Sequence, residues 1–249
     1  GEPGPGEVRL RHTAVGLNFI DINHRTGAYR LDSLPAVIGM EGAGVVEQVG
    51  EAVEGLASGD RVSYCMVLGS YAHARIIAAD RLIKLEDHTS DDTAAAVTLR
   101  GLTAHYLLKE LYPVQPGDVV LVQAAAGGVG LLLCQWAKHL GATVLGTVGT
   151  EAKAALAKAH GCDHPILYGE VDFAEAVMEL TDGHGVTVIY DAVGKETYEK
   201  GLGVIAERGW MVGYGQASGP MPLLDTQRLA AKGINVTRGA LGLFVRDPA

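Results

Sequence analysis

The sequence is poor in cysteine and proline and has no long hydrophobic run, and each shortage excludes a class of protein. Its three cysteines, at positions 65, 134 and 162, do not make a disulfide framework, which favours a reducing compartment. No apolar run reaches the roughly 18 residues that a membrane-spanning helix needs. The first residues, GEPGPGEVRL, lack the basic and then apolar segments of a signal peptide. A cytoplasmic protein without a membrane segment is therefore expected.

Glycine is the residue in surplus. The chain has 34 glycines but only 9 prolines among 249 residues, and no Gly-X-Y period runs through it. Neither collagen nor a low-complexity linker accounts for that composition. The formal net charge of −9 argues against a broad nucleic-acid-binding surface. The glycines are therefore expected at particular backbone positions.

The first third of the chain contains short β-rich segments separated by glycine. Their regular spacing predicts a small β-barrel or sandwich. The segments are EVRLRHTAVGL (7–17), GAGVVEQVG (42–50), DRVSYCM (60–66) and YAHARIIA (71–78). Helical spacing follows over residues 90–111, with Ser90 or Asp91 as the cap.

From Pro116 onward, predicted strands alternate with predicted helices. Alternation of this regularity predicts a parallel sheet with helices on both faces. Thr150 is the expected cap of the second helix. The strands are expected at 118–124, 142–149, 164–168, 185–194, 210–219 and 233–239, and the helices at 127–141, 150–161, 173–183 and 196–209, with a further helical piece before the last strand.

The turn after the first of these strands fits the dinucleotide fingerprint G-x-G-x-x-G, with Ala125, Gly127 and Gly130 at its three positions. The second glycine lets backbone approach a pyrophosphate, and the third lets the helix pack closely on the strand. The helix N-terminus supplies N–H donors. The alternative is a merely structural glycine turn. The predicted cofactor contacts here are Ala125, Ala126, Gly127, Gly128, Val129 and Gly130.

The end of the second strand favours NADPH over NADH. An acidic residue there would bind the ribose 2′-hydroxyl and repel a 2′-phosphate, but the strand ends in Gly149 and Thr150. Lys153 follows one turn into the helix. A small turn with a hydroxyl and a lysine suits a phosphate. The alternative is that Lys153 is only a solvated helix residue.

Six stretches together carry a resemblance to a known family. They are GLNFIDINHRTGAY (16–29), GMEGAGVVEQVG (39–50), GDRV (59–62), LRGLTAHYLL (99–108), AAAGGVGLLLCQWAKHLGATVLGTVGT (124–150) and YDAVG (190–194). The chain resembles the medium-chain dehydrogenase/reductase superfamily, in its zinc-free quinone oxidoreductase (zeta-crystallin-like) branch. The resemblance implies a GroES-like catalytic domain at 1–98, a Rossmann NADP-binding domain at 99–238, and the start of a return to the catalytic domain at 239–249. The catalytic domain is then expected to be incomplete at both ends, as in a fragment of a longer enzyme.

The resemblance also bears on metal binding. Where zinc alcohol dehydrogenases of the superfamily carry Gly-His-Glu, this chain has Gly39, Met40 and Glu41, and a thioether is a poor zinc ligand. No cysteine lies near Asn18, and three cysteines cannot form a four-cysteine structural site. The segment HGCDH (160–164) contains three ligand types, but it falls at a helix end, where the side chains are not expected to converge. No metal is predicted.

The function implied by the resemblance is hydride transfer from NADPH to a quinone or an α,β-unsaturated carbonyl. Asn18, Asp21 and Tyr29 then belong to the substrate side, and Thr103 to the nicotinamide neighbourhood. The alternatives are that Asn18 caps a turn, that Asp21 pairs with an arginine, and that Tyr29 is an ordinary loop tyrosine. No proton donor is predicted.

The resemblance implies further cofactor contacts and an assembly. Tyr168 would lie with Lys153 against the adenosine phosphate. The other positions implied are Gly149, Thr150, Gly215, Gln216, Ser218 and Arg238. A homodimer formed through the last Rossmann strand is implied as well. Two other functions stay open: an acyl-chain enoyl reductase of the same fold, and a non-catalytic, crystallin-like NADPH-binding protein.

Overall fold

The computed structural model describes residues 1–246, and the chain divides into two units. The first unit comprises Gly1–Leu102 together with the end of the chain from Phe244 onward. The second unit comprises Thr103–Leu243. The division falls within helix α2 (Asp91–His105). In the described part of the chain, no helix is long and apolar enough to cross a membrane.

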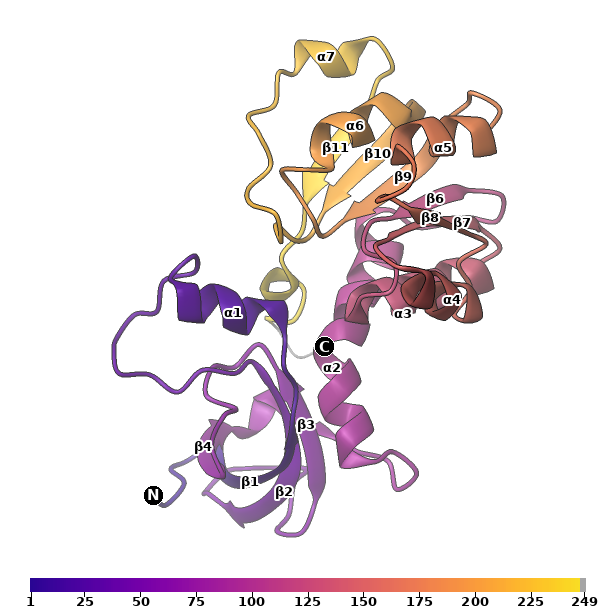
Figure 1. Ribbon diagram of the computed structural model, residues 1–249. Coiled ribbons are helices and arrows are strands. Elements are labelled where there is room, and N and C mark those ends of the chain that lie inside the picture. Colours follow the sequence, from indigo (N-terminus) through magenta and orange to yellow (C-terminus); the bar gives the residue numbers. More distant parts are fainter. Residues whose placement is uncertain (247–249) are drawn as a thin grey trace. The chain divides into compact units, whose positions relative to one another are not determined.

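The first unit is built on one five-stranded antiparallel sheet with the order β4-β1-β2-β3-β5 (Figure 1). Because β4 and β5 remain at its two edges, the prediction of a barrel or a sandwich is corrected to a single sheet. Gly44 allows β1 and β2 to approach closely, since a Cβ there would lie 2.1 Å from the Arg11 carbonyl oxygen. The strands are β1 (Glu7–Val15), β2 (Glu41–Val49), β3 (Arg61–Cys65), β4 (Ala74–Ala78) and β5 (Ile83–Lys84). The core of this unit consists of Val8, Leu10, Val46, Val62, Tyr64 and Ile77.

Two helices complete this part of the chain. Helix α1 (Phe19–Thr26), which the sequence analysis did not predict, lies between β1 and β2 and ends at Gly27 in the left-handed conformation. Helix α2 starts after Ser90, whose Oγ accepts a hydrogen bond from the Thr93 N–H at 3.1 Å. It continues as a turn of π-helix, Tyr106–Leu111.

The second unit contains a six-stranded parallel sheet with the order β11-β10-β9-β6-β7-β8. The strand order reverses between β6 and β9, and such a reversal opens a crevice at the carboxyl ends of the strands. Figure 1 shows α3 and α4 on one face of the sheet and α5 and α6 on the other. The strands are β6 (Val119–Val122), β7 (Thr143–Val148), β8 (His164–Leu167), β9 (Val186–Asp191), β10 (Ile205–Gly213) and β11 (Asn235–Arg238), and the helices are α3 (Gly128–His139), α4 (Glu151–Ala159), α5 (Phe173–Leu180), α6 (Tyr198–Val204) and α7 (Gln227–Ala230).

One predicted helix was too long. The sequence predicted a helix over 196–209, but α6 ends at Val204 and β10 begins at Ile205. Ile205 is fully buried and pairs with Val186 of β9. Burial in the sheet therefore overrides the helical spacing at this position. The strand predicted over 210–219 is also corrected, because β10 ends at Gly213.

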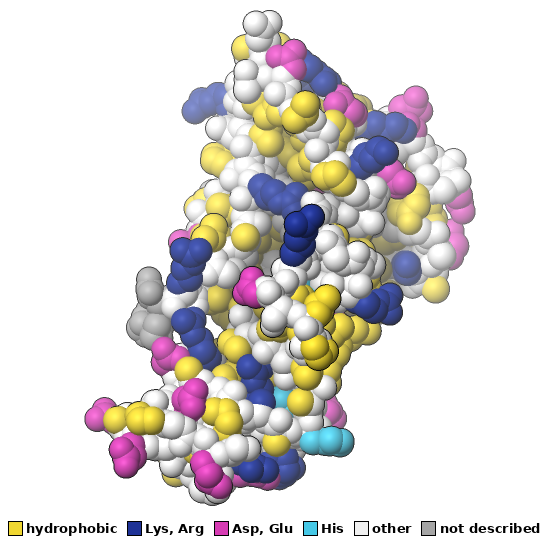
Figure 2. All heavy atoms as spheres, turned by 90° about the vertical axis from the view of Figure 1, so that its left-hand side faces the viewer, with side chains coloured by type: hydrophobic (Ala, Val, Ile, Leu, Met, Phe, Trp, Pro, Cys, Tyr) yellow, Lys and Arg dark blue, Asp and Glu magenta, His cyan; other side chains and the backbone are white. Residues whose placement is uncertain are grey.

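The surface carries both signs of charge. Figure 2 shows basic, acidic and apolar side chains interspersed over the face turned to the viewer. Most ion pairs join residues that are distant along the chain, such as Lys84 with Asp60 at 2.8 Å. Exposed pairs of this kind contribute little to stability.

Candidate functional site

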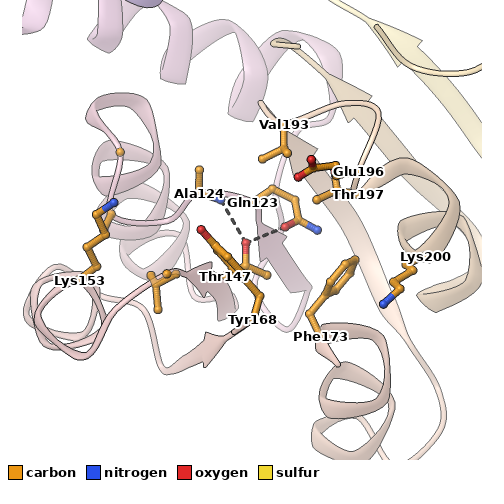
Figure 3. A pocket seen from close by; sticks show the side chains of 14 residues that line it. Gln123, Ala124, Thr147, Lys153, Tyr168, Phe173, Val193, Glu196, Thr197 and Lys200 are labelled. Carbon is orange, nitrogen blue, oxygen red and sulfur yellow. Dashed lines mark hydrogen bonds between the residues drawn. The ribbon is translucent and has the colours of Figure 1, made fainter. Parts of the chain in front are cut away.

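A cavity of about 330 Å³ opens in the second unit at the ends of β6, β7 and β9 (Figure 3). It lies at the reversal of strand order, where parallel sheets of this kind bind their ligands. Five of the predicted cofactor residues line it, namely Ala126, Gly127, Gly149, Lys153 and Tyr168. The sequence analysis missed the other lining residues, which are Gln123, Ala124, Thr147, Val148, Phe173, Val193, Glu196, Thr197 and Lys200.

The glycine-rich turn forms one end of the cavity. Ala124 adopts the left-handed conformation with φ +57°, and its carbonyl oxygen accepts from the Gly127 N–H at 2.9 Å. Gly127 is the N-cap of α3. A Cβ on Gly130 would lie only 2.3 Å from the Ala124 carbonyl oxygen, so the first turn of α3 packs where no side chain fits. The free N–H groups of a helix start attract an anion.

A second part of the wall combines a glycine, a tyrosine and a lysine. A Cβ on Gly149 would lie 2.6 Å from the Tyr168 hydroxyl oxygen, so glycine lets this hydroxyl lie against the end of β7. The Thr150 Oγ accepts from the Lys153 N–H at 3.3 Å and caps α4, as predicted. The Lys153 side chain reaches the cavity wall (Figure 3). A cation and a hydroxyl beside an open strand end suit a phosphate.

A buried aspartate fixes the third part of the wall. Asp191, which is fully buried, accepts through Oδ1 from the N–H groups of Val193 at 2.6 Å and Gly194 at 3.0 Å. Its Oδ2 accepts from the Thr197 hydroxyl at 2.7 Å. Burial raises the pKa of Asp191, and these hydrogen bonds oppose the shift. Asp191 therefore holds Val193 and Thr197 at the cavity. In the sequence, the signal that could have revealed Asp191 is an acidic residue at the end of an apolar strand.

Other predicted cofactor residues support the cavity without lining it. The Ser218 hydroxyl donates to the Val193 carbonyl at 2.8 Å and accepts from the Glu196 N–H at 3.1 Å, which joins the loops after β9 and β10. Arg238 donates to the Gln216 side-chain oxygen at 3.3 Å. Gly215 N–H donates to the Asp191 carbonyl. Cofactor contact by these residues stays a prediction, as it does for Ala125, Gly128, Val129, Gly130 and Thr150.

The wall residues fit a dinucleotide that carries an adenosine 2′-phosphate. Glycine at position 130 lets the first turn of α3 pack against Ala124, and glycine at position 149 lets the Tyr168 hydroxyl lie against the end of β7. The Gln123 side chain is 1% exposed, and its amide nitrogen has no hydrogen-bond partner within residues 1–246. An orphaned buried donor on a cavity wall is expected where a ligand supplies the acceptor.

A polar cluster lies in the first unit around Glu41, which is fully buried. Its Oε1 accepts from the Leu99 N–H at 2.6 Å, and its Oε2 accepts from the Asn18 amide nitrogen at 2.7 Å. Burial raises the pKa of Glu41, although both hydrogen bonds and the Arg100 charge oppose the shift. The Glu41 carboxylate therefore sets the orientation of the Asn18 amide.

Asp21 is the second acid of the cluster and is 2% exposed. Its Oδ2 accepts from the Asn18 backbone N–H at 2.9 Å and from the Tyr71 hydroxyl at 2.8 Å. Within the described residues its Oδ1 has no partner and no arginine pairs with it, so the alternative of an arginine pair is wrong. Burial, followed by the contact with Asp21, raises the pKa of Tyr71.

The four predicted catalytic residues belong to two units, with Asn18, Asp21 and Tyr29 in the first and Thr103 in the second. Asn18 is the N-cap of α1, so the capping alternative holds alongside the contact with Glu41. Tyr29 is half-buried with its ring edge-on to His24, at 6.3 Å between centroids. Thr103 is buried in the last turn of α2 and belongs to the second unit. The structure thus joins Asn18 and Asp21 to Glu41 and Tyr71, and Tyr71 was missed.

Metal-binding groups were searched for over residues 1–246, and no cluster of three or more His, Cys, Asp or Glu side chains was found there. In the segment 160–164, the Asp163 carboxylate is occupied by Lys138 at 2.6 Å and by the Val144 N–H at 2.9 Å. The Nδ1 of His160 lies 2.8 Å from the Leu156 carbonyl. That this protein needs no metal stays a prediction.

Comparison with known proteins gives the family. Residues 4–87 match the alcohol dehydrogenase GroES-like domain, and residues 128–247 match the family described as zinc-binding dehydrogenase. A quinone oxidoreductase of Pseudomonas aeruginosa is 47% identical over 249 residues, which cover 99% of this chain and 77% of the relative. The chain belongs to the quinone oxidoreductase branch of the medium-chain dehydrogenase/reductase superfamily. This confirms the resemblance and the two-part fold class predicted from the sequence.

Two further relatives of this oxidoreductase chain bear on its chemistry. A 2-haloacrylate reductase of Burkholderia sp is also 47% identical, over 255 residues that cover 99% of this chain and 77% of the relative. The crystal structure of an Escherichia coli quinone oxidoreductase complexed with NADPH is 42% identical. It superposes with a TM-score of 0.95 and covers 98% of this chain and 76% of that one.

Proposed function

We propose that this chain is an NADPH-dependent oxidoreductase that reduces quinones. The observation that carries the proposal is the cavity of the second unit. A glycine-rich helix start, a lysine and a strand end without an acid meet there. The quinone oxidoreductase relatives and the NADPH complex of the Escherichia coli enzyme support it.

Bound NADPH would supply a hydride to the acceptor. The turn at Gly127 would hold the pyrophosphate at the start of α3, where backbone N–H groups and the helix dipole favour an anion. Lys153 and the Tyr168 hydroxyl would hold the 2′-phosphate. Thr103 would border the nicotinamide, and Gly215, Gln216, Ser218 and Arg238 would border the cofactor.

The acceptor side is proposed around the start of α1. Asn18 and Asp21 are buried polar groups there, and they are flanked by Leu17 and Phe19, which are 67% and 52% exposed. Apolar surface with a few fixed polar groups fits a flat conjugated acceptor. Glu41 orients the Asn18 amide, and the second oxygen of Asp21 keeps an unused acceptor position. Tyr29 is the third proposed contact.

Steady-state oxidation of NADPH in the presence of 9,10-phenanthrenequinone tests the proposal. Turnover with NADPH that exceeds turnover with NADH is expected. Tight NADPH binding without turnover on a quinone or an enone would reject an enzyme and favour the crystallin-like alternative.

A second candidate acceptor is an activated alkene, favoured by the 47% identity to a 2-haloacrylate reductase. The two acceptors are separated by the ratio of kcat/KM for phenanthrenequinone and 2-chloroacrylate. A ratio in favour of the quinone supports the first candidate. The acyl-chain enoyl reductase alternative requires turnover of an enoyl thioester.

A cytoplasmic homodimer is also proposed. β11 is an edge strand of the parallel sheet, and an unpaired strand edge is a template for pairing with a second copy. Light scattering on the eluted protein would give twice the mass of one chain, and a single-chain mass would reject the dimer.

A further inference from the structure

Gln123 is a buried polar side chain on the wall of the cavity. It follows β6 directly, before the glycine-rich turn, and is 1% exposed. Its amide nitrogen is buried and has no hydrogen-bond partner anywhere in residues 1–246. Because an unpaired buried donor is costly, such a group calls for an acceptor from outside the chain.

The orientation of this amide follows from its neighbours. The Thr147 hydroxyl donates to the Gln123 Oε1 at 2.6 Å and accepts from the Ala124 N–H at 3.2 Å. Since the hydroxyl proton needs an acceptor and the amide oxygen provides it, Oε1 faces Thr147. The amide nitrogen then faces the cavity. Figure 3 shows it directed away from Thr147, on the side where Phe173 and Thr197 lie.

The surroundings of the amide nitrogen are suited to a base rather than to a phosphate. Phe173, 6% exposed, and Val193 line this part of the cavity. Lys153, the residue proposed for the 2′-phosphate, comes from α4, which follows another strand. Lys200 also lines the cavity, but its charge is paired with the Asp172 carboxylate. Phe173 and Val193 suit the face of a purine and the amide N–H suits its ring-nitrogen acceptors, while the polar Thr197 and Glu196 line the same part of the cavity.

We propose that Gln123 binds the adenine base of the cofactor, donating a hydrogen bond from its amide nitrogen to a ring nitrogen. The inference rests on the proposed function, because it takes NADPH as the ligand. Gln123 thereby selects the base, while Lys153 selects the 2′-phosphate. Thr147 is a positioning residue, since it holds the amide in the donating orientation.

Calorimetric titration with 5′-AMP and 2′,5′-ADP tests this assignment, because the two ligands share the base and differ in the 2′-phosphate. Gln123→Met removes the donor at similar length and is expected to weaken both ligands by the same factor, about 5-fold. Lys153→Gln is the matched control and is expected to weaken 2′,5′-ADP alone. A Gln123→Met protein that binds both ligands as the wild type does would overturn the inference and assign the amide to a buried water.

The ring nitrogen is identified with analogues of 5′-AMP in which N1, N3 or N7 is replaced by CH. One of the three is expected to bind the wild type about 5-fold more weakly and to lose nothing further on Gln123→Met, because the contact is already absent. Equal affinity of the wild type for all three and for 5′-AMP would contradict a contact with a ring nitrogen.

Two controls separate other kinds of failure. A wild type that binds neither 2′,5′-ADP nor NADPH would reject the proposed cofactor, whereas binding that ignores Gln123 rejects only the inference. If Gln123→Met does not fold, Gln123→Glu keeps an acceptor for Thr147 and, as a carboxylate, offers no donor, so it should weaken 5′-AMP by at least about 5-fold.

Discussion

The cavity of the second unit is shaped by backbone, whereas the polar cluster of the first unit is held by side chains. Gly127, Gly130 and Gly149 shape the cavity within one stretch of sequence. In the cluster, Glu41 binds groups that lie 23 and 58 residues away along the chain. A site made by local backbone leaves a motif in the sequence. A hydrogen-bond network between distant segments leaves no motif, although its side chains can be held as firmly as the backbone of a turn.

The largest effect is expected from removing the centre of the cluster. Glu41→Ala takes away the acceptor of the Asn18 amide and leaves a cavity, which should lower the free energy of unfolding by about 3 kcal/mol. Denaturant unfolding measures the loss. Glu41→Gln keeps the size and one acceptor and should lose less. Equal stability of Glu41→Ala and wild type would show that the cluster does not depend on its side chains.

The next effect concerns the backbone of the cavity. Gly130→Ala places a Cβ 2.3 Å from the Ala124 carbonyl oxygen, so strain of about 1–3 kcal/mol and weaker NADPH binding are expected. Thermal unfolding and fluorescence titration measure the two quantities.

Gly203→Ala is the matched control for that change, since a Cβ at Gly203 in α6 meets nothing within 4 Å. It should stabilise the protein by about 0.5–1 kcal/mol, because alanine loses less conformational freedom in a helix. A Gly130→Ala variant that behaves like Gly203→Ala would refute the tight packing at the turn.

A smaller and more selective effect is expected at Lys153. Lys153→Glu places a negative charge where the 2′-phosphate is proposed, and it should weaken NADPH at least about 10-fold more than NADH. Lys158→Glu, on the same helix and also exposed, should leave the ratio of the two dissociation constants unchanged. Equal losses of both cofactors in Lys153→Glu would remove the residue from the phosphate site.

The smallest effect is a difference in pH dependence within the first unit. Burial raises the pKa of Glu41 above its ordinary value of 4.5. A carboxyl with a raised folded-state pKa stabilises the fold fully below its unfolded value and loses that contribution as pH rises through the folded value. The stability of wild type relative to Glu41→Gln should therefore fall as pH rises above 4.5, as measured by urea unfolding across that range.

Asp91 provides the opposite case. The Thr13 hydroxyl, followed by Arg61, lowers the pKa of Asp91 from its ordinary value of 3.8. Its contribution is present above pH 3.8 and is lost as pH falls through the lowered value. The free energy of unfolding of wild type should therefore increase relative to that of Asp91→Asn as pH rises. The same direction for both variants would contradict the assigned burial of Glu41.

The sequence was sufficient where structure follows from local patterns. The strand and helix order of the second unit, the Thr150 cap and the fit at Gly127 and Gly130 all depend on residues within a few positions of each other. The boundary at Ile205 was wrong, because its pairing with Val186 is a tertiary contact that the helical spacing does not reveal.

The missed site residues have the same cause. The partner of Gln123 is Thr147, from the next strand, and that of Tyr71 is Asp21, 50 residues earlier. Only the position of Gln123, a polar residue at the end of a buried strand, gave a signal. The substrate-side role of Asn18 stays a prediction, and its hydrogen bond to Glu41, 23 residues away, could be found only from the fold.

A crystal structure of this protein with NADPH tests the central claim most directly, namely that the backbone-shaped cavity is the cofactor site. The account predicts the 2′-phosphate beside Lys153 and Tyr168, with the pyrophosphate at the start of α3. Density for NADPH elsewhere on the chain, with this cavity filled only by solvent, would contradict it.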